Sequence, residues 1–163
     1  MLWETANDRK ALAFVASSEQ EQVSRGLLSW LNEYPSMPAG VRMIDFEYLA
    51  DDTPGLTLST IQGAYITRRY LGGDYMAEYQ FKLIYRAQPG DSRNNRLKMD
   101  ETLDALGDWA AARAKTDKPD IGADKQVRGI VCNTRSSLFG RYENGDEDHQ
   151  ILMTMHYYAA KGA

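Results

Sequence analysis

The residue types best suited to chemistry are few and scattered in this sequence. The two histidines, His149 and His156, lie seven residues apart in one expected strand, and an odd spacing along a strand places side chains on opposite faces. We therefore do not expect them to share a metal ion. The acidic run Asp146, Glu147 and Asp148 lies beside His149, but such a run at a hairpin turn is more typical of a solvated surface than of a cation site.

Nucleophilic catalysis has equally little support. Cys132 is the only cysteine of the chain, so it forms no intramolecular disulfide, and we expect it to point into the core as a small apolar residue. Ser136 and Ser137 lie in an expected strand. The sequence contains no nucleophile elbow, glycine-rich phosphate loop or paired-cysteine motif. It therefore predicts a protein that is not an enzyme and that holds no cofactor or metal.

Length and composition predict one ordinary domain spanning residues 1–163. Hydrophobic residues make up 43% of the chain and charged residues 26%, which is typical of a soluble globular protein. The net charge of −4 argues against sequence-specific nucleic acid binding. No apolar run approaches the ~20 residues of a membrane span, and the N-terminus lacks the features of a signal peptide. We expect no membrane association and a cytoplasmic site of synthesis.

The longest clear pattern is a β-hairpin from Ile61 to Ala87. Gly72 and Gly73 lie between two strand-like runs and accept the positive φ values of a tight two-residue turn. Along the second strand, alternate residues from Tyr75 to Tyr85 are apolar, so this face should be buried. The turn predicts four opposed pairs: Leu71 with Asp74, Tyr70 with Tyr75, Ile66 with Tyr79, and Ala64 with Phe81.

A second hairpin is centred on Asn144 and Gly145, the strongest turn signal in the chain. It predicts three opposed pairs: Glu143 with Asp146, Arg141 with Asp148, and Leu138 with Ile151. On its last strand, one face should carry Ile151, Met153, Met155 and Tyr157. The opposite face then carries Leu152 and Tyr158, whose apolar character makes them candidates for an interface.

Two helices are expected to cover the sheet. The first runs from Glu19, with Ser17 or Ser18 as its cap, to Tyr34, and Gly26 within it either weakens the helix or marks close packing. The second is expected from Leu97 to Arg113. A strand should lie within Val41 to Leu49, whereas residues 1–18 fit a strand or a helical turn. The order predicts an α+β fold: an antiparallel or mixed sheet built on two long hairpins, with two helices on one face.

Four segments carry a family resemblance. They are Gly26-Leu27-Leu28-Ser29-Trp30-Leu31; Tyr70-Leu71-Gly72-Gly73-Asp74-Tyr75 through Glu78-Tyr79-Gln80-Phe81; Leu103-Asp104-Ala105-Leu106-Gly107-Asp108-Trp109; and Leu138-Phe139-Gly140-Arg141-Tyr142-Glu143-Asn144-Gly145 with Glu147-Asp148 and Gln150. Together these segments resemble the minor capsid or tail terminator (tail completion) proteins of prophages, from Val23 to Tyr158. They form the fold and contain no catalytic signature.

The resemblance implies an α+β subunit that forms a ring, expected to be a hexamer, at the head-proximal end of a phage tail or phage-tail-like particle. There the ring would stop growth of the tail tube. The implied partners are further copies of the chain, the tail tube protein, and sheath or head-tail connector proteins. The implied location is the particle, assembled in the host bacterial cytoplasm. The alternatives are another neck or connector protein, or a small-ligand-binding α+β domain.

Candidate contact residues follow from this role. The turn at Gly72 and Gly73 is suited to contact a neighbouring subunit, and Arg93 and Arg96, in an expected loop, are candidates for contact with an adjoining ring. A lumen that passes DNA would carry negative charge so that the duplex does not adhere to the wall. The main candidates for that charge are Asp146, Glu147 and Asp148; the other acidic clusters are Asp51 with Asp52, and Asp100, Glu101 and Asp104 on the second helix. Reversing Asp146, Glu147 and Asp148 to lysine should leave folding intact but impair the passage of DNA.

Overall fold

The computed structural model describes residues 13–50 and 53–160, so the expectations for residues 1–12 and for the pair Asp51 and Asp52 lie outside the described residues. Its elements, in chain order, are α2 (Ser17–Leu31), β1 (Ile44–Phe46), β2 (Gly55–Arg69), β3 (Tyr75–Ala87), α3 (Arg93–Arg113), β4 (Lys125–Cys132), β5 (Ser137–Arg141) and β6 (Glu147–Ala159). The α+β fold class predicted from the sequence is confirmed.

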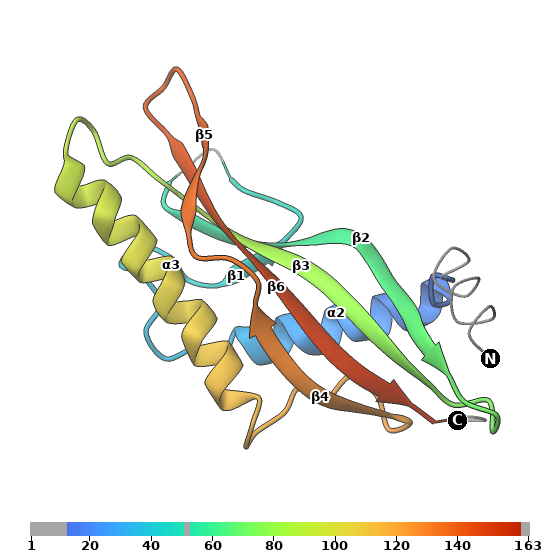
Figure 1. The fold of residues 1–163 in the computed structure, drawn as a ribbon. Helices are drawn as coiled ribbons and strands as arrows, with labels where there is room; N and C mark the ends of the chain where they lie inside the picture. Colours follow the sequence, from blue (N-terminus) through green and yellow to red (C-terminus); the bar gives the residue numbers. More distant parts are fainter. Residues whose placement is uncertain (1–12, 51–52, 161–163) are drawn as a thin grey trace.

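The strands form one mixed sheet in the order β1-β2-β3-β6-β4, with β5 paired to β6 beside β4 (Figure 1). Only β1 and β2 run parallel; all other neighbours are antiparallel. Helix α2 reaches the sheet through Ser24, whose hydroxyl lies 2.8 Å from that of Tyr79 on β3. Helix α3 reaches it through Asp100, which contacts His149 on β6. Both contacts are on one face, as the sequence predicted.

The core lies between this face and the two helices. On β3, the alternate residues Ala77, Tyr79, Phe81 and Leu83 are almost completely buried, which confirms the predicted apolar face. Their neighbours across the sheet are the buried residues of β6, and the helices cover them with regularly spaced apolar side chains. These further core residues are Ile151, Met153, Met155 and Tyr157 of β6, Val23, Leu27 and Leu31 of α2, and Leu103 and Leu106 of α3.

Both hairpin turns are one residue longer than predicted. The backbone N–H of Tyr70 donates to the carbonyl of Asp74 (3.0 Å), and Gly73 donates back to Tyr70 (3.0 Å). Leu71, Gly72 and Gly73 therefore form a three-residue loop, in which only Gly73 needs the left-handed conformation (φ 93°). The second hairpin has the same geometry: Tyr142 pairs with Asp146, and Gly145 has φ 96°.

The predicted residue pairs are consequently wrong. Every pair derived from a two-residue turn is displaced, in both hairpins. The structure instead pairs Arg69 with Tyr75, Ala64 with Tyr79, Thr60 with Phe81, Arg141 with Glu147, and Leu138 with His149.

The faces of β2 are nevertheless as predicted, because a second irregularity offsets the first. A register shift of one residue would turn Ala64 and Ile66 outward. A β-bulge between Ile66 and Arg68 adds one residue to β2 and turns them inward again. Both are buried. A second bulge, between Thr60 and Ala64, adds two residues and therefore leaves the faces unchanged. At this bulge, the side-chain carbonyl of Gln20 on α2 accepts a hydrogen bond from the backbone N–H of Ala64 at 2.5 Å.

The helix boundaries also differ from the prediction. Helix α2 begins at Ser17 after Ala16, so neither serine caps it, and it ends three residues before Tyr34. Helix α3 begins at Arg93, because the hydroxyl of Ser92 accepts the backbone N–H of Asn95 (3.1 Å) and caps the helix there. The expected loop at residues 92–96 is thus mostly its first turn. The strand expected within Val41 to Leu49 is only the three residues of β1.

Close packing explains the glycine inside α2. A Cβ atom at Gly26 would lie 2.2 Å from the backbone oxygen of Asp120, a separation that no real contact allows. The segment after α3 therefore crosses α2 at this point, and any side chain would push it away. Gly26 marks close packing, which was one of its two predicted meanings.

Truncating the central aromatic ring tests the core. We expect Phe81→Ala to lower the free energy of unfolding by about 3–5 kcal/mol, because the completely buried ring leaves a cavity. Lys82→Ala, one residue along on the opposite face, should cost less than about 1 kcal/mol. Urea denaturation of both variants measures the difference. Equal stabilities would contradict the assignment of faces.

The close contact between Gly26 and Asp120 predicts that alanine at position 26 destabilises the protein, although helix propensity alone predicts the opposite. In an open helix, Gly26→Ala would gain about 1 kcal/mol. Here we expect it to lower the melting temperature, because the added methyl group displaces the backbone of Asp120. The matched control is Ser29→Ala, an exposed position of the same helix, which should be neutral or slightly stabilising. A stabilised Gly26→Ala variant would show that the two segments do not cross so closely.

Candidate interaction surfaces

The turn between β2 and β3 is the most exposed apolar feature of the described residues. Leu71 at its tip is as accessible as in an extended chain, with a relative exposure of 110%, and Tyr70 is 38% exposed. The predicted contact residues Gly72 and Gly73 are exposed beside them. Figure 1 shows this turn at one end of the long sheet, beyond the end of β6. The glycines are the predicted contact residues, but the apolar surface of the turn belongs to Leu71.

The flanks of this turn are charged. Arg68 and Arg69 are exposed, and the guanidinium of Arg68 lies 5.5 Å from the centre of the Tyr70 ring. Asp74 is the one acidic residue of the turn, and the hydroxyl of Tyr158 donates to it at 2.6 Å. This hydrogen bond raises the pKa of Tyr158. Tyr158, a predicted interface residue, is thus half-buried and holds the base of the turn.

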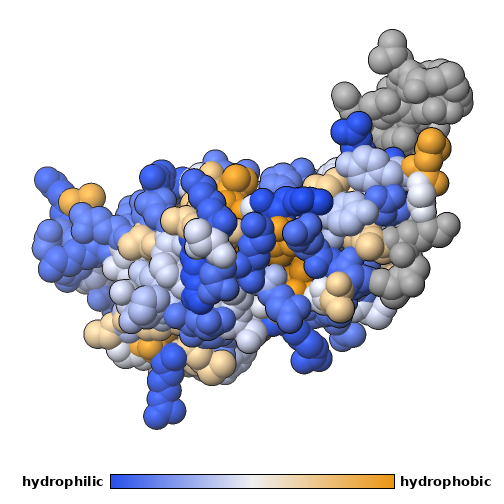
Figure 2. Space-filling view, turned by 90° about the horizontal axis from the view of Figure 1, so that it is seen from below, coloured by the Kyte–Doolittle hydropathy of each residue, from blue (hydrophilic) through white to orange (hydrophobic). Residues whose placement is uncertain are grey.

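The sheet face opposite the helices is polar and internally bonded. The hydroxyl of Tyr65 donates to Glu78 (2.7 Å) and accepts from Gln80 (3.0 Å). Leu152, the other predicted apolar contact residue, is half-buried in this face and lies opposite Lys82. In the view of Figure 2, the surface is mostly hydrophilic and its hydrophobic areas are small and separate. Polar residues such as Lys82, Gln80 and Glu78 share the open face of the sheet with Leu152, so we find no broad apolar interface there.

Strand β5 presents a second exposed apolar segment. Leu138, Phe139 and Tyr142 are 46%, 52% and 44% exposed. Within the described residues, β5 pairs only with β6, so its outer edge has free backbone donors and acceptors. Such an edge can pair with another strand. The sequence pattern assigned these residues to the hairpin without identifying the open edge.

The expectation of an exposed acidic turn is wrong. Asp146, Glu147 and Asp148 are only 4%, 1% and 2% exposed. The extra residue in the turn explains part of the difference, because it places Asp146 opposite Tyr142 and Glu147 opposite Arg141. The three side chains therefore do not supply the negative charge of a lumen surface.

Basic side chains from three elements neutralise Asp148 and Glu147, whereas Asp146 accepts hydrogen bonds from the amides of Gln88 (2.8 Å) and Asn144 (3.0 Å). Arg86 of β3 binds Asp148 through two parallel hydrogen bonds of 2.6 and 2.8 Å, a strong and directional arrangement. Glu147 accepts from Arg96 of α3 at 2.8 Å and from Arg141 of β5 at 3.1 Å. Arg96 is thus committed to an internal ion pair, which argues against its predicted contact with an adjoining ring. Arg93 remains exposed.

The two histidines lie on opposite faces, as predicted. His149 is buried between two carboxylates: its Nδ1 lies 2.7 Å from Asp100 and its Nε2 3.2 Å from Glu147. His156 lies on the other face, 3.5 Å from Glu78. Ser136 also donates to Asp100 (2.7 Å), but it makes no hydrogen bond with His149. The cluster joins α3 to β6 and does not assemble a serine nucleophile with a base.

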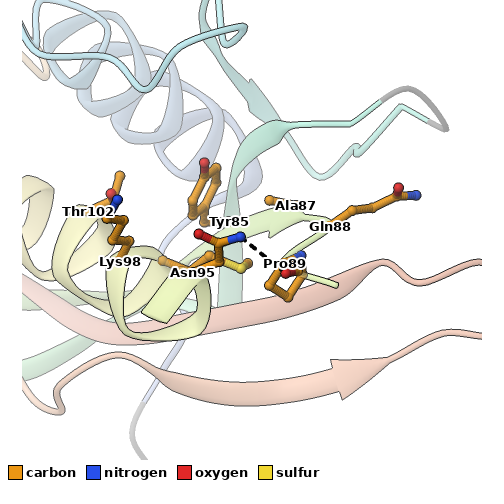
Figure 3. Close-up of a pocket in the computed structure, with 8 residues that line it drawn as sticks. Tyr85, Ala87, Gln88, Pro89, Asn95, Lys98 and Thr102 are labelled. Carbon is orange, nitrogen blue, oxygen red and sulfur yellow. Dashed lines mark hydrogen bonds between the residues drawn. The ribbon is translucent and has the colours of Figure 1, made fainter. Parts of the chain in front are cut away.

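A shallow pocket of about 190 Å³ lies between the end of β3 and the start of α3 (Figure 3). Tyr85, Asn95 and Lys98 are among its lining residues. Asn95 bonds the backbone carbonyl of Pro89 at 3.3 Å, and burial raises the pKa of Tyr85. The volume is below the ~300 Å³ at which small-molecule sites begin, and Lys98 is the only charged lining residue.

Residues 13–50 and 53–160 contain no group of three or more His, Cys, Asp or Glu side chains that could hold a metal ion. No helix there is long and apolar enough to cross a membrane. Cys132 is half-buried against the core, and burial raises the pKa of its thiol.

Comparison with known proteins gives no relative for this chain: no protein-family model matches it, and no curated protein matches its sequence.

The acidic cluster predicts stability loss in acid. Hydrogen bonds from Arg96, His149 and Arg141 outweigh the effect of burial and hold the pKa of Glu147 at about 2, below its usual 4.5. A depressed carboxyl pKa stabilises the fold above the unfolded value, and that contribution disappears as pH falls from about 4.5 to 2. We expect Glu147→Gln to lose about 1–3 kcal/mol at pH 7 and less at pH 3, where part of the contribution has disappeared.

Urea denaturation at the two pH values measures this prediction. Glu143→Gln, an exposed position of the adjacent turn, is the matched control and should be neutral at both. Reversing Asp146, Glu147 and Asp148 to lysine should prevent folding, contrary to the sequence-based expectation. A stably folded triple variant would contradict the buried ion pairs.

Proposed function

We propose that the protein is a structural subunit that assembles into a ring, and that this ring is the tail terminator of a phage tail or phage-tail-like particle. One observation carries the proposal: the two hairpin turns project from opposite ends of one sheet. Tyr75, beside the first turn, pairs with Ala159, whereas Ala87 at the other end pairs with Glu147 beside the second turn. A subunit with a projecting turn at each end can contact a different neighbour through each.

Contacts of this kind are heterologous, because the surfaces that meet are different. Repeated around an axis, they close into a ring or continue as a filament. A terminator also needs two unlike axial faces, since it must match the last ring of the tube and refuse a further one. The helix-covered face and the polar open face of the sheet are chemically different in the required way. A hexamer is the expected number of copies, from the family resemblance alone.

A small-ligand-binding domain has less support. The pocket between β3 and α3 is lined by polar side chains such as Asn95, Lys98 and Thr102, but its volume of about 190 Å³ is small for a ligand site. The described residues show exposed apolar side chains at turns and at a strand edge instead. These features favour contact with other proteins.

Two measurements test the proposal. Mass photometry of the purified protein at rising concentration should show closed oligomers of one size, expected to be hexamers. Electron microscopy of the particle, with the chain carrying a visible label, should place that label at the head-proximal end of the tail. A label on the neighbouring neck would favour the connector alternative. A chain that stays monomeric and is absent from any particle would contradict both the terminator and the connector assignment.

A further inference from the structure

A groove runs between helix α2 and the neighbouring strands β1 and β2. It has a volume of about 420 Å³. Glu21, Arg25 and Leu28 line it from the helix side; Phe46, Glu47 and Thr60 line it from the strand side. The groove is larger than the pocket near α3 and contains apolar as well as charged side chains.

The floor of the groove has unsatisfied apolar surface. Phe46 at the end of β1 is 39% exposed, and Leu28 is half-buried beside it. An exposed phenyl ring beside a leucine gains by burial against an apolar partner. Its volume of about 420 Å³ is sufficient for one or two side chains.

The charge of the groove is set mainly by acids. Glu21 and Glu47 are exposed carboxylates, and Arg25 is its one basic lining residue. Burial works against ionisation of Glu47, but hydrogen bonds from Thr60 and Ser59 outweigh it and lower its pKa. Its carboxylate is therefore fixed in place and charged at neutral pH. A complementary partner is apolar at its centre and positive at its edge.

The turn between β2 and β3 has this complementary chemistry. Leu71 and Tyr70 present apolar side chains at the tip, and Arg68 and Arg69 place two positive charges beside them. Asp74, the acid of the turn, is already engaged by the hydroxyl of Tyr158. The turn therefore presents an apolar tip next to a net positive charge.

A subunit cannot place this tip in its own groove. Tyr75, immediately after the turn, donates a hydrogen bond to Glu19 in the first turn of α2. The tip extends beyond that end of the helix (Figure 1), whereas the helix residues that line the groove lie in the following turns, from Gln20 to Leu28. A β2–β3 tip that occupies the groove must therefore come from another copy of the chain.

We propose that the β2–β3 turn of one copy docks into the α2–β1 groove of a second copy, with Leu71 against Phe46 and Leu28. Arg68 and Arg69 then lie near Glu21 and Glu47. Each copy has one turn and one groove, so each docks into one neighbour and receives another. This contact rests on the proposed ring as its setting, and it specifies which surfaces of the subunit meet.

Chemical cross-linking tests the contact directly. In a Cys132→Ser background, one batch of protein carries Leu71→Cys and a second carries Phe46→Cys. The mixed batches, treated with a short bismaleimide, should give a covalent dimer containing one chain of each kind. The matched control pairs Leu71→Cys with Ala112→Cys, an exposed position on α3 away from the groove. Equal cross-linking in the two mixtures would overturn the proposal.

Affinity provides an independent readout. Leu71→Asp should weaken self-association, measured by sedimentation velocity, at least about tenfold, because it removes the apolar anchor and adds repulsion from Glu21 and Glu47. Leu97→Asp on α3 changes another exposed apolar side chain (55% exposed) outside the contact and should weaken self-association less than twofold. An unaffected Leu71→Asp variant, or wild-type protein that shows no self-association, counts against the contact.

The outcomes separate this contact from the proposed function. Closed rings that persist in Leu71→Asp would keep the ring and remove the turn-in-groove contact. Specific cross-links between copies that form only open chains would keep the contact and remove the ring. A monomer whose Phe46→Cys thiol resists labelling would place a segment of the same chain in the groove, and the proposal would then be wrong.

Discussion

The antiparallel pairing of β3 with β6 is the interaction on which the rest of the structure depends. It runs without a bulge from Tyr75 opposite Ala159 to Ala87 opposite Glu147, and it forms the centre of the sheet. Because the pairing is regular, every second residue of both strands faces the helices, and the buried rings of Tyr79, Phe81 and Tyr157 share one layer. The irregularities lie in the strands that flank this regular pair. Strand β2 contains bulges on one side, and β4 and β5 share the other side of β6.

Polar contacts fasten the helices at the two ends of this pair. At one end, Glu19 of α2 accepts hydrogen bonds from the hydroxyls of Tyr75 and Tyr157. Burial and this carboxylate both raise the pKa of the two tyrosines, so they remain donors at neutral pH. At the other end, His149 and Glu147 of β6 bind Asp100 and Arg96 of α3. Buried charged groups must be paired to be tolerated, and this requirement fixes how α3 sits along the sheet.

The surfaces that are free to contact other molecules adjoin these fixed contacts: the turn at Leu71 directly precedes Tyr75, and β5 carries Arg141, a partner of Glu147. The turn at Leu71 and the open edge of β5 are exposed apolar features on a rigid sheet, and a rigid support reduces the entropy lost when such features bind a partner. The groove beside α2 exists because the short β1 leaves Phe46 partly uncovered.

The sequence by itself determined the fold class, the two hairpins, the two helices and the buried faces of β3 and β6, because alternation and helical spacing are local properties of the chain. It located both turns but placed them one residue short, since Gly73 and Gly145 suit either turn type and only the strand pairing selects one. Tertiary structure alone decided the fate of Asp146, Glu147 and Asp148. Their partners lie far away in the chain: Arg86 binds Asp148 from 62 positions earlier, Arg96 binds Glu147 from 51 positions earlier, and the amide of Gln88 binds Asp146 from 58 positions earlier. A local pattern of acidic residues therefore indicated exposure where long-range contacts impose burial.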